Sequence, residues 1–108
     1  MLKIQIDRNV KTGGYRLKMK GHCGFDKEGR DIVCAAASIL CLSMAQVLRE
    51  NKDKLEDKPR IIIHNGKCLL EWQPKARYEG ALLNSLYTVK AGLRVLQNEY
   101  PDYIEMRE

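Results

Sequence analysis

His22 and Cys34 are the residues of this 108-residue sequence whose types and spacing suggest chemistry. Cys34 follows Asp31, and Asp is a favoured helix N-cap because its carboxylate accepts backbone N–H groups that have no partner in the first turn. A thiol in that turn faces the positive end of the helix dipole, which favours the nucleophilic thiolate. A nearby imidazole can take the thiol proton and later give it to a leaving amine. Such a pair is the dyad of a cysteine hydrolase.

The elements around this pair must bring it together. Alternating polarity predicts strands over residues 2–7 and 15–20, joined into a hairpin by a Lys-Thr-Gly-Gly turn. Residues 22–30 show no periodicity and are predicted to form an exposed, mobile loop. Apolar residues at helical spacing then predict an amphipathic helix over residues 31–51. The histidine ends a strand and the cysteine begins a helix, but spacing also allows a packed cysteine and an incidental histidine.

The second half of the chain repeats this order. An Asn-Gly turn, the strongest short hairpin signal, joins predicted strands at residues 61–64 and 67–72. A second amphipathic helix is predicted over residues 78–100, and residues 103–106 are expected to add a short edge strand. The order β-β-α-β-β-α predicts an α+β two-layer sandwich, with two helices packed on a mostly antiparallel sheet. The length fits one domain spanning residues 1–108.

Composition narrows the class of protein. Hydrophobic residues make up 44% and charged residues 31%, values that exclude a disordered tail, a collagen-like fibre and a coiled coil. No continuous apolar run approaches the ~20 residues that span a bilayer. The N-terminus alternates in polarity and lacks the apolar stretch of a signal peptide. We therefore expect a soluble cytoplasmic protein without a membrane partner.

The cysteines are expected to be free thiols. A reducing cytoplasm disfavours disulfides, and no C-x-x-C pair suggests a zinc ribbon or a redox motif. His64 and Cys68 flank the Asn-Gly turn, but structural zinc usually needs four ligands. We expect no metal and no other cofactor. The sequence contains four cysteines, which are Cys23, Cys34, Cys41 and Cys68.

The positive charge is concentrated near the N-terminus. Residues 1–30 hold 8 Lys/Arg and 3 Asp/Glu, whereas residues 31–108 hold 11 of each, so the first segment carries the net charge of +5. A basic face of this kind can contact nucleic acid or an acidic partner. The alternative is a solvated, lysine-rich strand edge that resists aggregation.

The residues around the candidate pair resemble a known signature. Gly21-His22, a short Gly-containing loop and the run Asp-Ile-Val-Cys-Ala-Ala-Ala-Ser at residues 31–38 resemble the motif of the ribosomal-processing cysteine protease family, Prp. The predicted order of strands and helices is compatible over nearly the whole chain. One departure is Cys23, because the family usually has a small Ala after Gly-His. Cys23 adds a second thiol beside the site but removes neither candidate residue.

The resemblance implies a specific activity. Family members are cytoplasmic, typically dimeric cysteine endopeptidases that need no cofactor. They remove the N-terminal extension of a large-subunit ribosomal protein precursor of the L27 type during ribosome maturation. Carried over to this sequence, Cys34 is the nucleophile and His22 the general base and acid, while Asp31 and Ser38 support the site. Asp31 either caps the helix or orients His22.

Two further features bear on such a site. Gly21, Gly24 and Gly29 are expected to give the loop its hinges, so that it closes over an extended peptide. Backbone N–H groups of the first helical turn are expected to meet the oxyanion. Tyr87 and Tyr100 on the second predicted helix are expected to serve a homodimer face.

A second hypothesis from another class remains open. The chain can be a non-enzymatic RNA- or ribosome-binding assembly module that uses the basic N-terminal hairpin. That module would bind with strong salt dependence and would be indifferent to Cys34. A protease would lose its activity in Cys34→Ala and keep its fold.

Overall fold

The computed structural model describes residues 1–27 and 30–108. Its elements follow the predicted order, including the short last strand. They are β1 (Leu2–Asn9), β2 (Gly14–Lys20), α1 (Ile32–Glu50), a 3₁₀ turn (Lys52–Lys54), β3 (Arg60–His64), β4 (Lys67–Trp72), a 3₁₀ turn (Ala76–Tyr78), α2 (Glu79–Glu99) and β5 (Ile104–Arg107).

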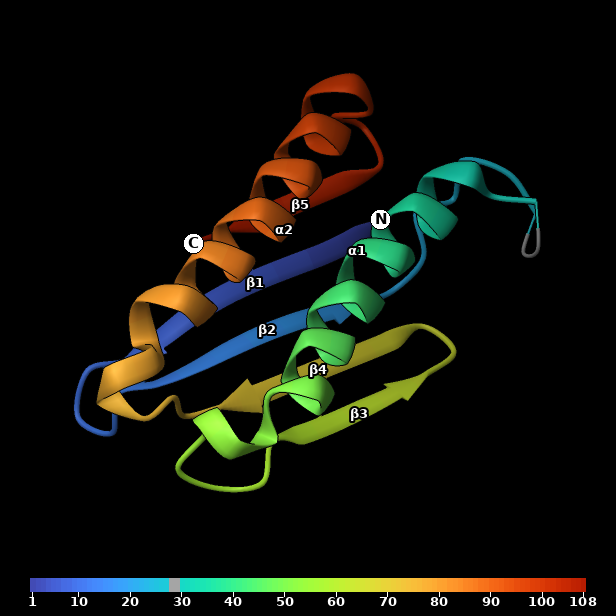
Figure 1. Ribbon diagram of the computed structural model, residues 1–108. Helices are drawn as coiled ribbons and strands as arrows, with labels where there is room; N and C mark the ends of the chain where they lie inside the picture. Colours follow the sequence, from blue (N-terminus) through green and yellow to red (C-terminus); the bar gives the residue numbers. More distant parts are fainter. Residues whose placement is uncertain (28–29) are drawn as a thin grey trace.

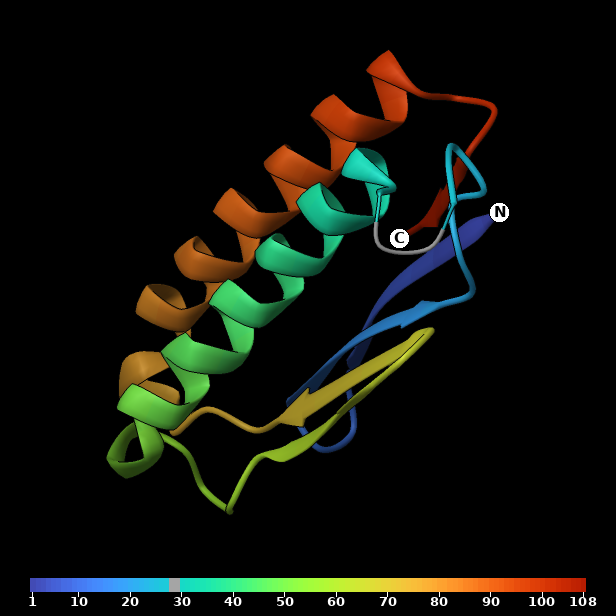
Figure 2. The ribbon, with the colours of Figure 1, turned by 90° about the vertical axis from the view of Figure 1, so that its right-hand side faces the viewer.

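The strands form one mixed sheet in the order β3-β4-β2-β1-β5. Neighbouring strands are antiparallel except for β5, which runs parallel to β1. Both helices lie side by side on one face, as Figure 1 shows, and Figure 2 shows that the other face of the sheet has no helix over it. This confirms the predicted α+β sandwich and leaves one broad sheet face uncovered.

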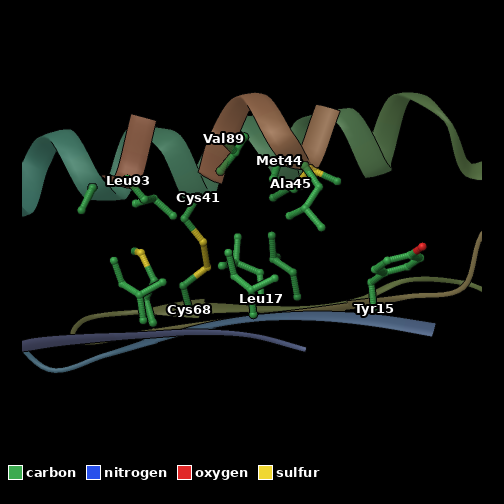
Figure 3. Packing of buried hydrophobic residues seen from close by; sticks show 14 of the residues in the cluster. Tyr15, Leu17, Cys41, Met44, Ala45, Cys68, Val89 and Leu93 are labelled. Carbon is green, nitrogen blue, oxygen red and sulfur yellow. A yellow bond between two sulfur atoms is a disulfide. The ribbon is translucent and has the colours of Figure 1, made fainter. Parts of the chain in front are cut away.

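The core lies between the helices and the sheet. Side chains on a strand alternate between its two faces, so every second residue of β1 and β2 points toward the helices. Leu17 of β2, Met44 of α1 and Leu93 of α2 are fully buried at this contact. Figure 3 shows them among the apolar side chains that fill the space between the layers.

Helix α1 is more apolar than the sequence patterns suggested. An 18-residue window of this helix has a mean hydropathy of 1.8, so α1 is long and apolar enough to cross a membrane by length and composition only. The expectation concerned a continuous apolar run, which Ser38, Ser43 and Gln46 interrupt here, so it did not anticipate a helix of this mean hydropathy. One face of α1 packs into the core through Val33, Ala37, Cys41, Met44, Ala45 and Leu48. Its opposite face remains apolar and is exposed at Ile32, Ile39 and Leu42, by 61%, 60% and 40%.

Two of the cysteines are bonded to each other. Cys41 on α1 and Cys68 on β4 form a disulfide across the core, although 27 positions separate them in the sequence (Figure 3). The expectation of four free thiols was wrong for this pair, because the fold directs both side chains into the same space between helix and sheet. Cys23 and Cys34 are free.

Candidate active site

Three segments meet at one end of the sheet. The chain leaving β2 carries His22, the first turn of α1 carries Cys34, and the β3–β4 turn lies beside them. His22, Cys34 and Ser38 line the same cavity, which has a volume of about 160 Å³. The fold thus brings together the imidazole and the thiol that the sequence analysis singled out.

Asp31 fixes Cys34 at the start of α1. One carboxylate oxygen, Oδ1, accepts the backbone N–H of Cys34 at 2.8 Å. The other oxygen, Oδ2, accepts the backbone N–H of Phe25 at 3.0 Å. Asp31 is therefore a helix N-cap that also holds the preceding loop, and the structure shows no hydrogen bond from it to His22 among the described residues. The Cys34 amide is occupied, so it is not available to an oxyanion.

The β3–β4 turn holds His22 in place. The Gly21 N–H donates to the carbonyl of Gly66 at 2.9 Å. A Cβ at Gly66 would lie 3.0 Å from Nε2 of His22, and Gly66 itself has a φ of 75°. Glycine is therefore needed at this position both for the turn and for the close approach of the imidazole. Sequence reasoning identified the Asn-Gly turn but did not connect it with the site.

Gly21 is also constrained by its surroundings. Its φ is 100°, and a Cβ there would lie 2.7 Å from the carbonyl oxygen of Met1. Because the contact is with backbone atoms, a side chain cannot be accommodated without moving β1. Gly21 therefore allows the chain to leave the sheet while its backbone lies against that of Met1.

The loop between β2 and α1 is anchored by an aromatic contact. The ring of Phe25 meets Tyr100 at 5.4 Å and Tyr103 at 5.3 Å between centroids, both edge-on. The loop that was expected to be mobile is thus docked through Phe25, and half-buried Tyr100 is one of its two aromatic contacts. Gly24 has a φ of 75° and open space around it, while Gly29 lies outside the described residues.

The walls of the cavity are mostly apolar. The disulfide between Cys41 and Cys68 closes one side, and Asn65 and Gly66 border another. Cys41 stands seven positions after Cys34, two helical turns along the same face, a spacing visible in the sequence. The remaining wall comes from strands distant in the sequence, so no local pattern could have identified it. The apolar lining residues are Leu2, Met19, Leu42 and Ile63.

Cys23 is a second thiol close to Cys34. Burial raises the pKa of Cys23 to about 12, and the neighbouring Cys34 and Asp31 add to this shift. Because only the thiolate is a good nucleophile, Cys23 stays a neutral thiol at ordinary pH. The cysteine that replaces the family's usual alanine is thus a small buried side chain with little reactivity.

Metal ligands do not gather at this site. Within residues 1–27 and 30–108, no group of three or more His, Cys, Asp or Glu side chains is placed to hold an ion. His64 and Cys68 both border the cavity, but the sulfur of Cys68 is bonded to Cys41.

Comparison with known proteins agrees with this geometry. The family model described as cysteine protease Prp matches residues 1–105. The chain is 29% identical over 108 residues to the ribosomal processing cysteine protease Prp of Mycoplasma genitalium, covering 100% of this chain and 96% of that protein.

Solved structures show the same fold. A crystal structure of the essential ribosomal processing protease Prp from S. aureus, with a covalently linked product peptide, superimposes with a TM-score of 0.75 at 21% identity over 100% of both chains. The same protease with a substrate peptide gives 0.71 at 20% identity, again over the whole of both chains. SMU.848 from Streptococcus mutans gives 0.68 at 19% identity, covering 99% of this chain and 92% of that one. With a family model spanning nearly its whole length, the chain belongs to the family of ribosomal-processing cysteine proteases, Prp.

Proposed function

We propose that this protein removes the N-terminal extension of a large-subunit ribosomal protein precursor of the L27 type, with Cys34 as nucleophile and His22 as general base and acid. The observation that carries the proposal is that both side chains line one cavity at the end of the sheet. Family membership makes the chain a cysteine protease. The relative and the solved structures described as ribosomal processing proteases support a ribosomal protein precursor as the substrate.

The reaction follows from the chemistry of the two groups. His22 takes the proton of Cys34, and the sulfur attacks the carbonyl carbon of the scissile bond, which becomes tetrahedral. When the C–N bond breaks, the imidazolium protonates the departing amine. The rest of the substrate remains bound to Cys34 as a thioester. His22 then takes a proton from water, which attacks the thioester. The C–S bond then breaks, the imidazolium returns its proton to the sulfur, and the product acid leaves and releases its own proton to water.

The first turn of α1 and the cavity support these steps. The amides of Ile32 and Val33 precede the helical hydrogen-bond ladder and remain first-turn donors for the oxyanion, since the Cys34 amide is bound to Asp31. Ser38 lies one turn after Cys34 and lines the same cavity, which supports a role for its hydroxyl in binding the dyad or the substrate. The apolar lining accepts an apolar substrate side chain, and the loop carrying Phe25 covers an extended peptide.

The cell compartment follows from the substrate. Ribosomal proteins are made and assembled in the cytoplasm in bacteria, so we place the protease there. In this reducing environment we expect the Cys41–Cys68 disulfide to be in equilibrium with its reduced form, in which the same two side chains are packed as free thiols.

A second copy of the chain is the proposed partner of α1. Its outer face exposes Ile32, Ile39 and Leu42 beside the candidate site, and burying such a stripe stabilises a homodimer. Ile39→Glu should yield a monomer in light scattering coupled to size exclusion. Val95→Glu, an equally exposed position on α2, should leave the dimer intact; dissociation in both variants, or a monomeric wild type, contradicts the proposal.

Intact mass spectrometry of the precursor tests the proposed activity. The extended precursor should show one internal cut after mixing with the protein, and the mature form without the extension should show none. Cys34→Ala and His22→Ala should abolish the cut, while Cys23→Ala, a matched loss of a thiol beside the site, should retain it. An intact precursor with folded, reduced wild-type protein would refute the substrate assignment.

Family membership also decides between the two hypotheses raised by the sequence. A non-enzymatic module does not fit a cysteine protease family, whereas a contact with ribosomal RNA is compatible with protease activity. The basic charge of residues 1–30 supports such a contact as an addition to catalysis.

A further inference from the structure

The uncovered face of the sheet carries two rows of side chains that run across the strands and differ in charge. One row alternates acidic and basic residues, and the other consists mainly of lysines. In the first row Asp7, Arg16, Glu71 and Arg60 are successive neighbours across β1, β2, β4 and β3. Arg16 pairs with Asp7 at 3.0 Å, and Arg60 pairs with Glu71 at 3.3 Å. Each cation in this row therefore has a carboxylate beside it, as expected for a sheet face that only meets water.

The second row has a carboxylate at one end only, where Glu105 of β5 lies opposite Lys3. Lys3, Lys20, Lys67 and His64 are successive neighbours across the same strands. Over residues 1–27 and 30–108, none of these lysines forms an ion pair. Like charges directly opposite each other destabilise a sheet, so a bound polyanion would stabilise this row. We call these four residues the lysine row.

A hollow beside the row strengthens the positive field. It has a volume of about 190 Å³ and is lined by Lys3, Lys18, Lys20 and Arg107. The one carboxylate there is Glu105, which lies opposite Lys3 but pairs with Arg107 at 3.9 Å. The hollow offers several cations to a group with the charge and size of a phosphate.

The rest of this face identifies the kind of polyanion. Within the described strands the Phe, Tyr and Trp residues are Tyr15 and Trp72, which stack on each other on the buried face and so give this face no platform for base stacking. A basic surface that binds a membrane usually also has exposed large apolar residues to anchor it. Here the most exposed large apolar residues lie on the helices, in loops and on the helix-facing side of β3, away from the uncovered face. The cations can therefore recognise a phosphate backbone and nothing in the bases, which suits double-stranded RNA.

We infer that the lysine row and the adjoining hollow bind the phosphate backbone of structured RNA. The inference rests on the proposed function, because a ribosomal protein that itself binds RNA is basic and would be repelled by these lysines. Lys20 directly precedes Gly21 and Lys67 directly follows Gly66, so the row lies at the site end of the sheet. His64 and Lys67 also border the candidate-site cavity, so this end of the row reaches its rim. Lys3 and Lys20, at the other end of the row, are not among the described residues that line this cavity.

Fluorescence anisotropy with a labelled double-stranded RNA hairpin tests the inference. With about four phosphate contacts, affinity should fall roughly 100-fold between about 50 and about 200 mM salt. The double variant Lys3→Ala/Lys20→Ala should lower the slope of log affinity against log salt by about 2. The matched variant Arg49→Ala/Lys52→Ala removes the same charge from exposed positions away from the sheet face and should keep the wild-type slope.

The outcomes separate this inference from the proposed function. An equal loss in both double variants would mean that net charge alone attracts RNA, and competition by phosphatidylserine vesicles as strong as by unlabelled RNA would mean that any anionic surface suffices. Either result overturns the inference, as does salt-independent binding. Precursor cleavage measured without RNA reports on the protease alone and should be unchanged in the Lys3→Ala/Lys20→Ala variant. If the protein cleaves the precursor but does not bind RNA, only the inference about RNA is refuted. If it binds RNA but does not cleave the precursor, only the proposed substrate is refuted.

Discussion

The Asp31 carboxylate accepts the Cys34 backbone N–H at 2.8 Å, so the residue that begins α1 also sets the position of the candidate nucleophile. Its second oxygen holds Phe25. Helix formation, loop docking and thiol placement thus depend on one buried side chain.

Asp31→Ala should lower both stability and activity. Removal of an N-cap costs about 1–2 kcal/mol in the free energy of unfolding, because first-turn amides lose their acceptor. Urea denaturation measures this loss, and precursor cleavage measures the accompanying fall in rate. Asp31→Asn keeps one acceptor oxygen and should fall between wild type and Asp31→Ala in both measurements. An unaltered cleavage rate in Asp31→Ala would show that the cap does not position Cys34.

The Gly66→Ala variant tests whether the β3–β4 turn positions His22. The methyl group would lie 3.0 Å from the imidazole Nε2, and the residue would have to keep a φ of 75°. Displacing a catalytic group by about 1 Å can lower kcat by about 10- to 100-fold.

A matched glycine separates strain from displacement. Gly13 has a φ of 74° and nothing within 4 Å of its Cβ position, so Gly13→Ala carries backbone strain without touching the site. Both variants should lose about 1–2 kcal/mol of stability, and only Gly66→Ala should lose activity at a temperature where both remain folded. An equal fall in kcat for Gly66→Ala and Gly13→Ala would show that the β3–β4 turn does not position His22.

Local patterns were enough to predict most of the fold. Alternation in β1 and β2, the Asn-Gly turn and the helical spacing of apolar residues each reflect a geometry that one segment imposes on itself. The end of β2 and the start of α1 are also linked by only a short loop, so the meeting of His22 and Cys34 in one cavity was accessible from the sequence.

The remaining features depend on contacts between distant segments. The approach of Gly66 to His22, the Cys41–Cys68 bond and the docking of Phe25 on Tyr100 each join parts of the chain that no short pattern relates. The parallel pairing of β5 with β1 is of the same kind, since a four-residue strand carries too little pattern to choose its neighbour.

Phe25→Ala should release the loop that precedes α1. The ring loses two edge-on contacts, with Tyr100 and Tyr103, which contribute about 0.5–1.5 kcal/mol each. We expect a higher KM for the precursor and faster trypsin cleavage after Lys27, because a loose loop no longer covers the peptide. Phe25→Tyr keeps the ring and should resemble wild type; trypsin cleavage at the wild-type rate in Phe25→Ala would contradict the docking.

Cys23 should resist alkylation while Cys34 reacts. Burial raises the pKa of Cys23 to about 12, so the reactive thiolate of Cys23 is rare up to about pH 9. Peptide mapping after iodoacetamide treatment of the folded protein should find label on Cys34 and little on Cys23. His22→Ala should slow the labelling of Cys34, because the imidazole no longer takes its proton. If Cys23 were labelled as fast as Cys34, Cys23 could not be a buried, neutral thiol.

The same raised pKa predicts how stability changes at high pH. An unfolded thiol loses its proton near its ordinary value of 9.0, whereas Cys23 in the folded protein keeps the proton until about pH 12. The unfolded chain therefore binds fewer protons between these values, so the free energy of unfolding falls as the pH rises from about 9 toward 12. Cys23→Ala should make this fall less steep in urea denaturation series, and Cys34→Ala should have a smaller effect in the same direction, because Cys34 only adds to the shift that burial causes. An equal slope in wild type and Cys23→Ala would show that the proton on Cys23 does not contribute to folding.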